Sequence, residues 1–242
     1  MDAPSRVATL AAALGIAGAV VFAVGPLSVQ IGAANPLVGF RVFLLGALLG
    51  LVALLVASIG LWRTRATAGR GGRGRALLGA LLGFAVIGVV LLAAGGARDL
   101  PQINDITTNP DDPPLFTAAL RDPANRDRDM SYPGDEFAEQ QRTAYADLAP
   151  IRVPLPPSLA FDSSKRSAEA LGWKVIHGDA AKGALEASDE SPLFRFVDDI
   201  SIRIRPDVDG AIIDVRSKSR DGRSDLGANA ERIRNFRALV VE

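Results

Sequence analysis

The chain has 242 residues, of which 48% are hydrophobic and only 6% are aromatic, and its mean hydropathy is +0.20. So apolar a composition is unusual for a soluble globular protein of this size and indicates membrane segments. The formal net charge of +0 gives no reason to expect nucleic acid as a partner, and the absence of cysteine excludes disulfides, thiolate catalysis and cysteine-ligated zinc.

Three apolar runs predict a membrane domain over residues 1–95. Each run has about 18 to 21 residues, enough for a helix to cross a hydrocarbon core of roughly 30 Å. An alternative interpretation of the first run is a secretory signal peptide, because Arg6 precedes it and Gly-Ala-Ala at 32–34 resembles a cleavage site. The sequence leaves open whether the first span is cleaved. The predicted transmembrane helices lie at about 7–25, 42–62 and 76–94.

Arginine placement predicts how the three spans are oriented. The loop between spans two and three contains five arginines and no acid, whereas the opposite side offers only Arg41 and Arg98. The positive-inside rule therefore predicts a cytoplasmic N-terminus, a multi-pass protein of the inner membrane and a periplasmic C-terminal domain. Anionic lipid is the expected partner of the loop arginines. These are Arg63, Arg65, Arg70, Arg73 and Arg75.

Two spans carry paired glycines four residues apart, Gly46 with Gly50 and Gly79 with Gly83. Such pairs let a neighbouring helix backbone approach closely, within one chain or between chains. None of the three apolar runs contains a charged residue, which argues against an ion pathway or a transporter.

The remaining residues, 96–242, predict an outer domain of α+β class, with an antiparallel sheet flanked by helices. Residues 99–114 are polar and interrupted by prolines, and we expect an extended arm there. Helical spacing predicts one helix near 134–148 and another over 162–171, and the prolines in 150–157 require extended chain between them. The sequences WKVIHG and GALEAS indicate short strands.

The clearest strands are LFRFVDDISIRIRP (193–206) and AIIDVRSKSR (211–220). Turn residues between them predict an antiparallel hairpin. Matching the apolar faces places Ile202 opposite Ile213, and Asp199 opposite Arg216 on the exposed side. Helical periodicity from Leu226 to Val240 predicts a final helix, with Ser224 or Asp225 as its N-cap.

Three segments of the outer domain carry a family resemblance: QINDITT (102–108), LFRFVDDISIRIRP (193–206) and IDVRSKSRDGRSDLGANAERIRNF (213–236). On these segments the outer domain resembles a bacterial family known as domain of unknown function 1499. The resemblance covers none of the three spans. It implies no activity and no catalytic residue.

The third segment contains the candidate ligand-binding residues. One interpretation is an anion or small-ligand corner, in which guanidinium groups join free amides at a helix N-terminus. The other is structural: Asp225 caps the helix, Asn229 ties the turn, and the arginines pair with Asp198, Asp199 and Asp214. Two of the candidates, Ser217 and Ser219, fall on the inward parity of their strand, where a hydroxyl needs a partner. The candidates are Arg216, Ser217, Ser219, Arg220, Arg223, Asp225 and Asn229.

The sequence offers no assembled set of residues for catalysis, and we predict no catalytic residue, metal site or cofactor. The single histidine is His177, and a triad of Ser217 or Ser224 with His177 and Asp198 is not accompanied by a nucleophile-elbow motif. Two alternative functions of different class therefore remain open. The protein is a membrane-anchored envelope module that binds a protein, lipid or polymer without catalysis, or it is a membrane-tethered enzyme that uses the Arg/Ser/Asp corner on an envelope substrate.

Overall fold

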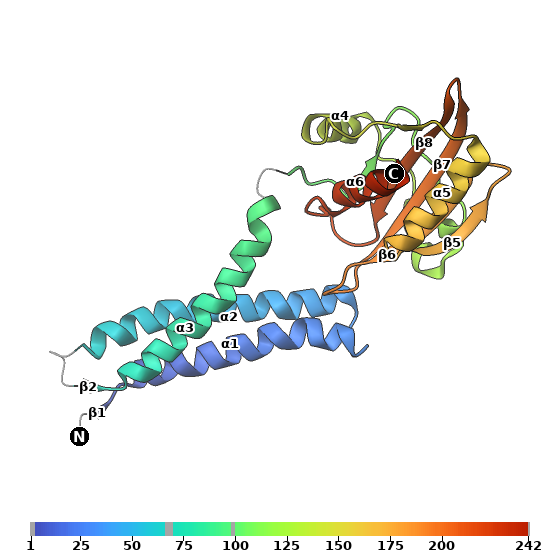
Figure 1. Cartoon of the computed structure of the whole chain (residues 1–242). Coiled ribbons are helices and arrows are strands. Elements are labelled where there is room, and N and C mark those ends of the chain that lie inside the picture. Colours follow the sequence, from blue (N-terminus) through green and yellow to red (C-terminus); the bar gives the residue numbers. More distant parts are fainter. Residues whose placement is uncertain (1–2, 66–69, 98–99, 242) are drawn as a thin grey trace. The chain divides into compact units, whose positions relative to one another are not determined.

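The computed structural model describes residues 3–65, 70–97 and 100–241. The chain forms two compact units (Figure 1). The helical unit comprises Met1–Arg98 together with the loop Pro192–Arg195, and the C-terminal domain comprises Asp99–Ser191 and Phe196–Glu242.

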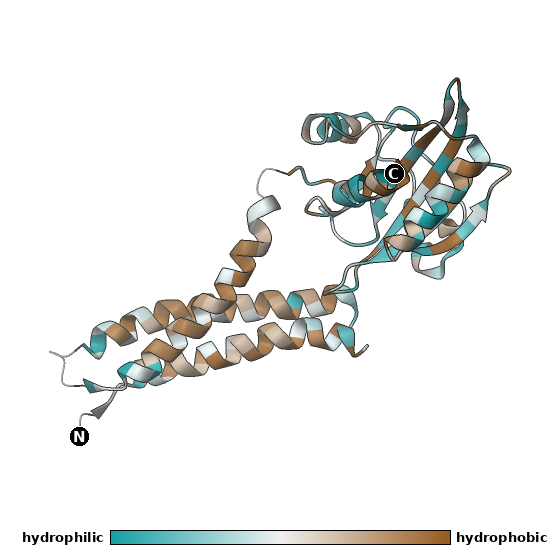
Figure 2. Cartoon of the chain, viewed as in Figure 1, coloured by the Kyte–Doolittle hydropathy of each residue, from teal (hydrophilic) through white to brown (hydrophobic). Residues whose placement is uncertain are grey.

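Three long helices make up most of the helical unit, and each is apolar and long enough to cross a membrane. Figure 2 shows hydrophobic residues along most of their length. Side-chain oxygens cap two of them: Ser5 accepts from the Ala8 amide, and Asn35 accepts from the Val38 amide. The length and apolar composition of these three helices therefore indicate a multi-pass membrane protein. The helices are α1 (Arg6–Gln30), α2 (Pro36–Arg63) and α3 (Arg73–Ala94).

Both glycine pairs pack inside the chain. A Cβ on Gly46 would come within 2.3 Å of the Phe22 amide nitrogen of α1, and one on Gly79 within 2.4 Å of the Ala11 carbonyl oxygen. A Cβ on Gly83 would lie 2.5 Å from the carbonyl oxygen of Gly50 on α2. The missing side chains thus allow the three backbones to touch, as small residues do at helix contacts in membranes. Short strands β1 (Ala3–Pro4) and β2 (Arg70–Gly71) pair in parallel, and η2 (Gly95–Ala97) follows α3.

The C-terminal domain is built on an antiparallel sheet of order β3-β8-β7-β6-β5, with β4 also paired to β8. Helices α4 (Asp135–Ala144), α5 (Pro157–Ala170) and α6 (Ala228–Val240) flank it, which confirms the predicted α+β class. The strands are β3 (Asp105–Thr107), β4 (Ile151–Val153), β5 (Lys174–Asp179), β6 (Ala184–Glu190), β7 (Val197–Asp207) and β8 (Gly210–Ser219).

One face of this sheet carries the apolar core and is covered by α5 and α6, so we call it the helix-covered face. Alternate residues of β7 and β8 supply its isoleucines and valine, as the period of two predicts. Trp173 stacks on Phe236 of α6 with ring centroids 5.4 Å apart. The buried core includes Leu185, Ile200, Ile202, Ile204, Ile213, Val215, Ala230, Ile233 and Phe236.

The hairpin of β7 and β8 has a different register from the predicted one. Ile202 pairs with Val215, so the expected pairing of Ile202 with Ile213 is wrong by two residues. The reason is the turn, which places only two residues between the paired Asp207 and Gly210 and is centred one position later than expected. A shift of two leaves every side chain on its predicted face.

The opposite face of the sheet is buried as well, against expectation. Asp199 pairs with Lys218 rather than Arg216, and both Asp199 and Arg216 are 0% exposed. The cause is an irregular stretch, residues 109–132, which contains the short helices η3 (Ala119–Arg121) and η4 (Pro123–Asn125) and lies across this face. We call it the covering segment, and this side the loop-covered face.

Three element boundaries also differ from prediction. β7 begins at Val197 rather than 193, because residues 192–195 belong to the helical unit. α5 begins at Pro157, five residues before the expected start, since proline suits the first helical position. Within the expected arm, Asp105–Thr107 form a buried strand because the apolar Ile103 and Ile106 pack into the core.

Candidate functional site

The predicted corner is divided between two faces of the sheet. Residues 216–219 form the end of β8, where successive side chains point to opposite sides, and Arg220 follows directly after the strand. Arg216 and Arg220 point to the loop-covered face, whereas Ser217 and Ser219 point to the helix-covered face.

On the helix-covered face, Asn229 joins the two inward hydroxyls. Ser217 Oγ donates to Asn229 Oδ1 at 2.6 Å, and Asn229 Nδ2 donates to Ser219 Oγ at 2.9 Å. Arg232 Nη1 donates to Ser217 Oγ at 3.1 Å and to Asn229 Oδ1 at 2.7 Å. All four residues are buried, so the hydroxyls have the partners that their burial requires.

Arg232 was not predicted, and it links this cluster to two carboxylates. Its Nη2 donates to Asp198 Oδ2 at 2.6 Å, and its Nε donates to Asp189 Oδ2 at 2.9 Å. Burial raises the pKa of Asp198, and the Arg232 guanidinium opposes that rise. The available signal was spacing, since Arg232 follows Asn229 by three residues and shares its side of the helix.

Asp225 stabilises the start of α6 without being its N-cap. The N-cap is Gly227, at φ +88°, so the prediction of Ser224 or Asp225 in that position is wrong. The reason is that the chain makes a turn at residues 225–228 before the helix begins, with the Ala228 amide donating to the Asp225 carbonyl oxygen. Gly227 adopts the left-handed backbone conformation in this turn, which glycine does without steric cost. Asp225 still accepts from the Gly227 and Asn229 amides, both at 2.9 Å. Arg223 is exposed and has no hydrogen bond or ion pair with any described residue.

Arg216 lies at the centre of a charged layer on the loop-covered face. Its Nε and Nη2 donate to the two oxygens of Asp105 at 2.8 and 2.7 Å, and Lys218 Nζ donates to the same carboxylate at 2.8 Å. The remaining Arg216 contacts are the carbonyl oxygens of Pro114 and Met130, at 3.2 and 3.0 Å. Arg216 and Asp105 are both 0% exposed, so this is a buried ion pair in which every Arg216 side-chain nitrogen donates a hydrogen bond.

Two aromatic rings of the covering segment enclose the Arg216 guanidinium. Its carbon lies 4.7 Å from the Phe116 ring centroid and 5.5 Å from that of Tyr132, within cation–π range. Burial raises the pKa of Tyr132 to about 12, so the phenol stays protonated at neutral pH.

Arg220 holds a second point of the covering segment. Its Nε and Nη2 donate to the Asp199 carboxylate at 2.9 and 2.7 Å, and Nη2 also donates to Asp122 at 2.8 Å. Asn125 Nδ2 donates to Asp199 at 2.9 Å. The Ala124 amide and then Arg220 lower the pKa of Asp122.

Glu186 of β6 holds a third point. Its carboxylate accepts from the backbone amides of Thr117, Ala118 and Ala119 at 2.8, 2.9 and 2.9 Å, and from the Thr117 hydroxyl. A carboxylate that accepts several amides is a strong charge-assisted anchor. Nothing in the local sequence of β6 indicates this role.

The structure does not bring the considered triad together. His177 is exposed on β5, which the order β8-β7-β6-β5 places about 14 Å from β8 at the usual strand spacing. Ser217 bonds Asn229 and Arg232 instead of an imidazole. Among the described residues, no three His, Asp or Glu side chains are grouped to hold a metal ion.

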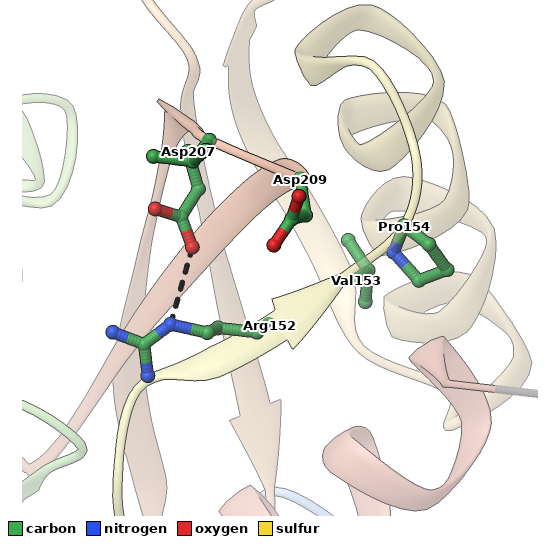
Figure 3. Close-up of a pocket in the computed structure, with 6 residues that line it drawn as sticks. Arg152, Val153, Pro154, Asp207 and Asp209 are labelled. Atoms are coloured by element: carbon green, nitrogen blue, oxygen red, sulfur yellow. Dashed lines mark hydrogen bonds and ion pairs between the residues drawn. The ribbon is translucent and has the colours of Figure 1, made fainter.

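An open depression lies at the tip of the β7–β8 hairpin (Figure 3). Arg152 Nε donates across it to Asp207 Oδ2 at 3.1 Å. Gly210 allows the hairpin tip to pack closely against β4, because a Cβ at this position would come within 2.3 Å of the Val153 carbonyl oxygen. Val208 is 95% exposed. The depression has a volume of about 480 Å³ and is lined by Arg152, Val153, Pro154, Asp207, Val208 and Asp209.

The family model described as Protein of unknown function (DUF1499) matches residues 105–240. The match starts with β3 and ends with α6, so it contains both faces of the sheet and none of α1–α3. No curated protein and no solved structure matches the chain.

Proposed function

The chain belongs to the DUF1499 family, and we propose that its C-terminal domain is a non-enzymatic module that binds a protein partner on the periplasmic side of the inner membrane. Three helices that are long and apolar enough to cross a membrane support the anchoring. The arginine-rich loop between α2 and α3 supports this orientation, because loops rich in arginine stay in the cytoplasm.

The depression at the hairpin tip carries the proposal. Val208, at the tip of the hairpin, is 95% exposed and is available for an apolar contact with a partner. Beside it, the Asp209 carboxylate has no hydrogen bond or ion pair with any described residue, whereas Asp207 is paired with Arg152. An apolar side chain next to a free carboxylate fits a protein segment that presents a basic residue beside an apolar one.

We propose a structural role for the 216–229 cluster. The alternative, a membrane-tethered enzyme, needs these side chains to reach a substrate, yet Arg216 and Ser217 are 0% exposed. Arg220, Asp225 and Asn229 are engaged in contacts that fix the covering segment and the start of α6. Arg223 alone of the cluster faces solvent without a described partner.

Reporter fusions test the orientation. A phosphatase that is active only outside the cytoplasm should be active when fused to the C-terminus and inactive when inserted within residues 66–72. The opposite pattern would show that the C-terminal domain faces the cytoplasm.

Site-specific photocrosslinking in cells tests the partner. A crosslinker at Val208 should give one discrete protein adduct, and a crosslinker at Leu120, which is 52% exposed in the covering segment, should not. Asp209→Lys should remove the adduct and fail to complement a deletion strain, while Asp127→Lys, an equal charge change in the covering segment, should retain both. Equal adducts from both positions, or an adduct that survives Asp209→Lys, would refute the proposed contact.

A further inference from the structure

A second depression lies in the helical unit, at the end where α2 leads into α3. It has a volume of about 460 Å³ and is lined by Trp62, Arg63, Arg65 and Arg70. The Arg65 guanidinium carbon lies 4.9 Å from the Trp62 ring centroid, so the ring positions this cation. Three guanidinium groups therefore line one small concavity.

The chain on both sides of this depression is fixed. Arg63 ends α2, and Thr64 closes the helix by donating from its amide and its hydroxyl to the Gly60 carbonyl oxygen, at 3.0 and 2.8 Å. On the other side, Arg70–Gly71 pair with Ala3–Pro4, and the Ser5 amide donates to the Gly71 carbonyl at 3.0 Å. These contacts hold the flanking backbone in place.

The arginines of the depression have no ion pair with any described residue, and the described part of the helical unit, residues 3–65, 70–97 and 192–195, contains no Asp or Glu. The sequence has no Asp or Glu between residues 3 and 98. The buried arginines of the C-terminal domain differ, because Arg216 and Arg232 each bind a carboxylate directly. A guanidinium without a counter-charge presents its donors in a fork that matches phosphate oxygens.

We propose that this depression binds the phosphate headgroup of an anionic phospholipid such as phosphatidylglycerol. Helices α2 and α3 expose apolar side chains a few residues from the depression in sequence, including Ile59, which is 50% exposed, and Leu77, which is 51% exposed. Such side chains suit contact with acyl chains. Trp62, 61% exposed, is a residue type favoured at the membrane–water boundary. A free phosphate would use the guanidinium groups but neither the apolar surface nor the tryptophan.

Fluorescence quenching of Trp62 by bromine-labelled lipids tests the site in the full chain. Trp173, the second tryptophan, is replaced by phenylalanine so that only Trp62 reports. In detergent micelles, brominated phosphatidylglycerol should quench more strongly than brominated phosphatidylcholine, with a relative affinity of about fivefold for each participating arginine. Native mass spectrometry of the chain with both tryptophans should retain phosphatidylglycerol, which gives a readout independent of the Trp173 change.

Two triple variants with equal charge change distinguish a defined binding site from a general electrostatic attraction between the arginines and anionic lipid. Arg63→Gln, Arg65→Gln and Arg70→Gln together should abolish the preference. Arg6→Gln, Arg73→Gln and Arg75→Gln together, which do not line the depression, should retain most of it. Equal losses in both variants would refute a defined site. Competition by millimolar glycerol phosphate, with loss of the preference, would refute the lipid as the ligand.

Discussion

Replacing Asp105 with asparagine removes one negative charge from the centre of the loop-covered face and changes almost nothing in shape. The carboxylate accepts from Arg216 at 2.8 and 2.7 Å and from Lys218 at 2.8 Å. Asparagine leaves two cations facing a neutral amide that is itself a donor. Removing one partner of a buried ion pair costs about 3–5 kcal/mol, a large part of the 5–15 kcal/mol that stabilises a typical domain.

The assay is urea unfolding of the full chain in detergent, followed by the fluorescence of Trp173 with Trp62 replaced by phenylalanine. The matched control is Asp147→Asn, which breaks an equally close bidentate pair with Arg234, at 2.7 and 2.8 Å. That pair is 38% and 52% exposed, so its loss should cost only about 0.2–1 kcal/mol. Equal costs for Asp105→Asn and Asp147→Asn would refute the argument from burial.

Three further outcomes are expected. Asp225→Ala should lower the free energy of unfolding by about 0.5–2 kcal/mol in the same urea assay, since two amides at the start of α6 lose their acceptor. Gly79→Leu should reduce the yield of folded chain in detergent, measured by size-exclusion chromatography, whereas Gly88→Leu should not, because a Cβ there has no neighbour within 4 Å. Asp122, whose folded-state pKa lies below 3.8, contributes stability that is fully present above pH 3.8 and is lost as the pH falls through the folded value. The stability difference between Asp122→Asn and the parent chain should therefore shrink below that pH, and a constant difference would contradict the pairing.

The helix-covered face could be predicted from periodicity because local pattern and burial agree there. Alternation in β7 and β8 identified Ile202 and Val215 as inward, and a two-residue error in register did not alter that result. The loop-covered face could not be predicted in the same way. Its outward charges follow the pattern of a solvated surface, and only the covering segment, which has no regular period, makes them buried.

The candidate cluster shows the same limit. Local spacing indicated that Ser217 and Ser219 need a partner and that Asp225 supports the start of the last helix. It could not identify Asp105 as the partner of Arg216, because the two are 111 positions apart in the sequence. Nor could it indicate that Glu186 holds the amides of the covering segment. Ion pairs between distant residues leave no periodic signal in either strand.

The charged layer also determines how the covering segment can move. It is attached at Glu186, Asp199 and Arg216, and releasing any one of these points would remove hydrogen bonds from a buried charged group. Partial detachment is therefore costly at every step. Opening should be cooperative, so that the anchored amides of the segment exchange their hydrogens together, at a rate close to that of the strands beneath it. Although it has little regular structure, the segment should behave in exchange and proteolysis as part of the sheet and not as a flexible loop.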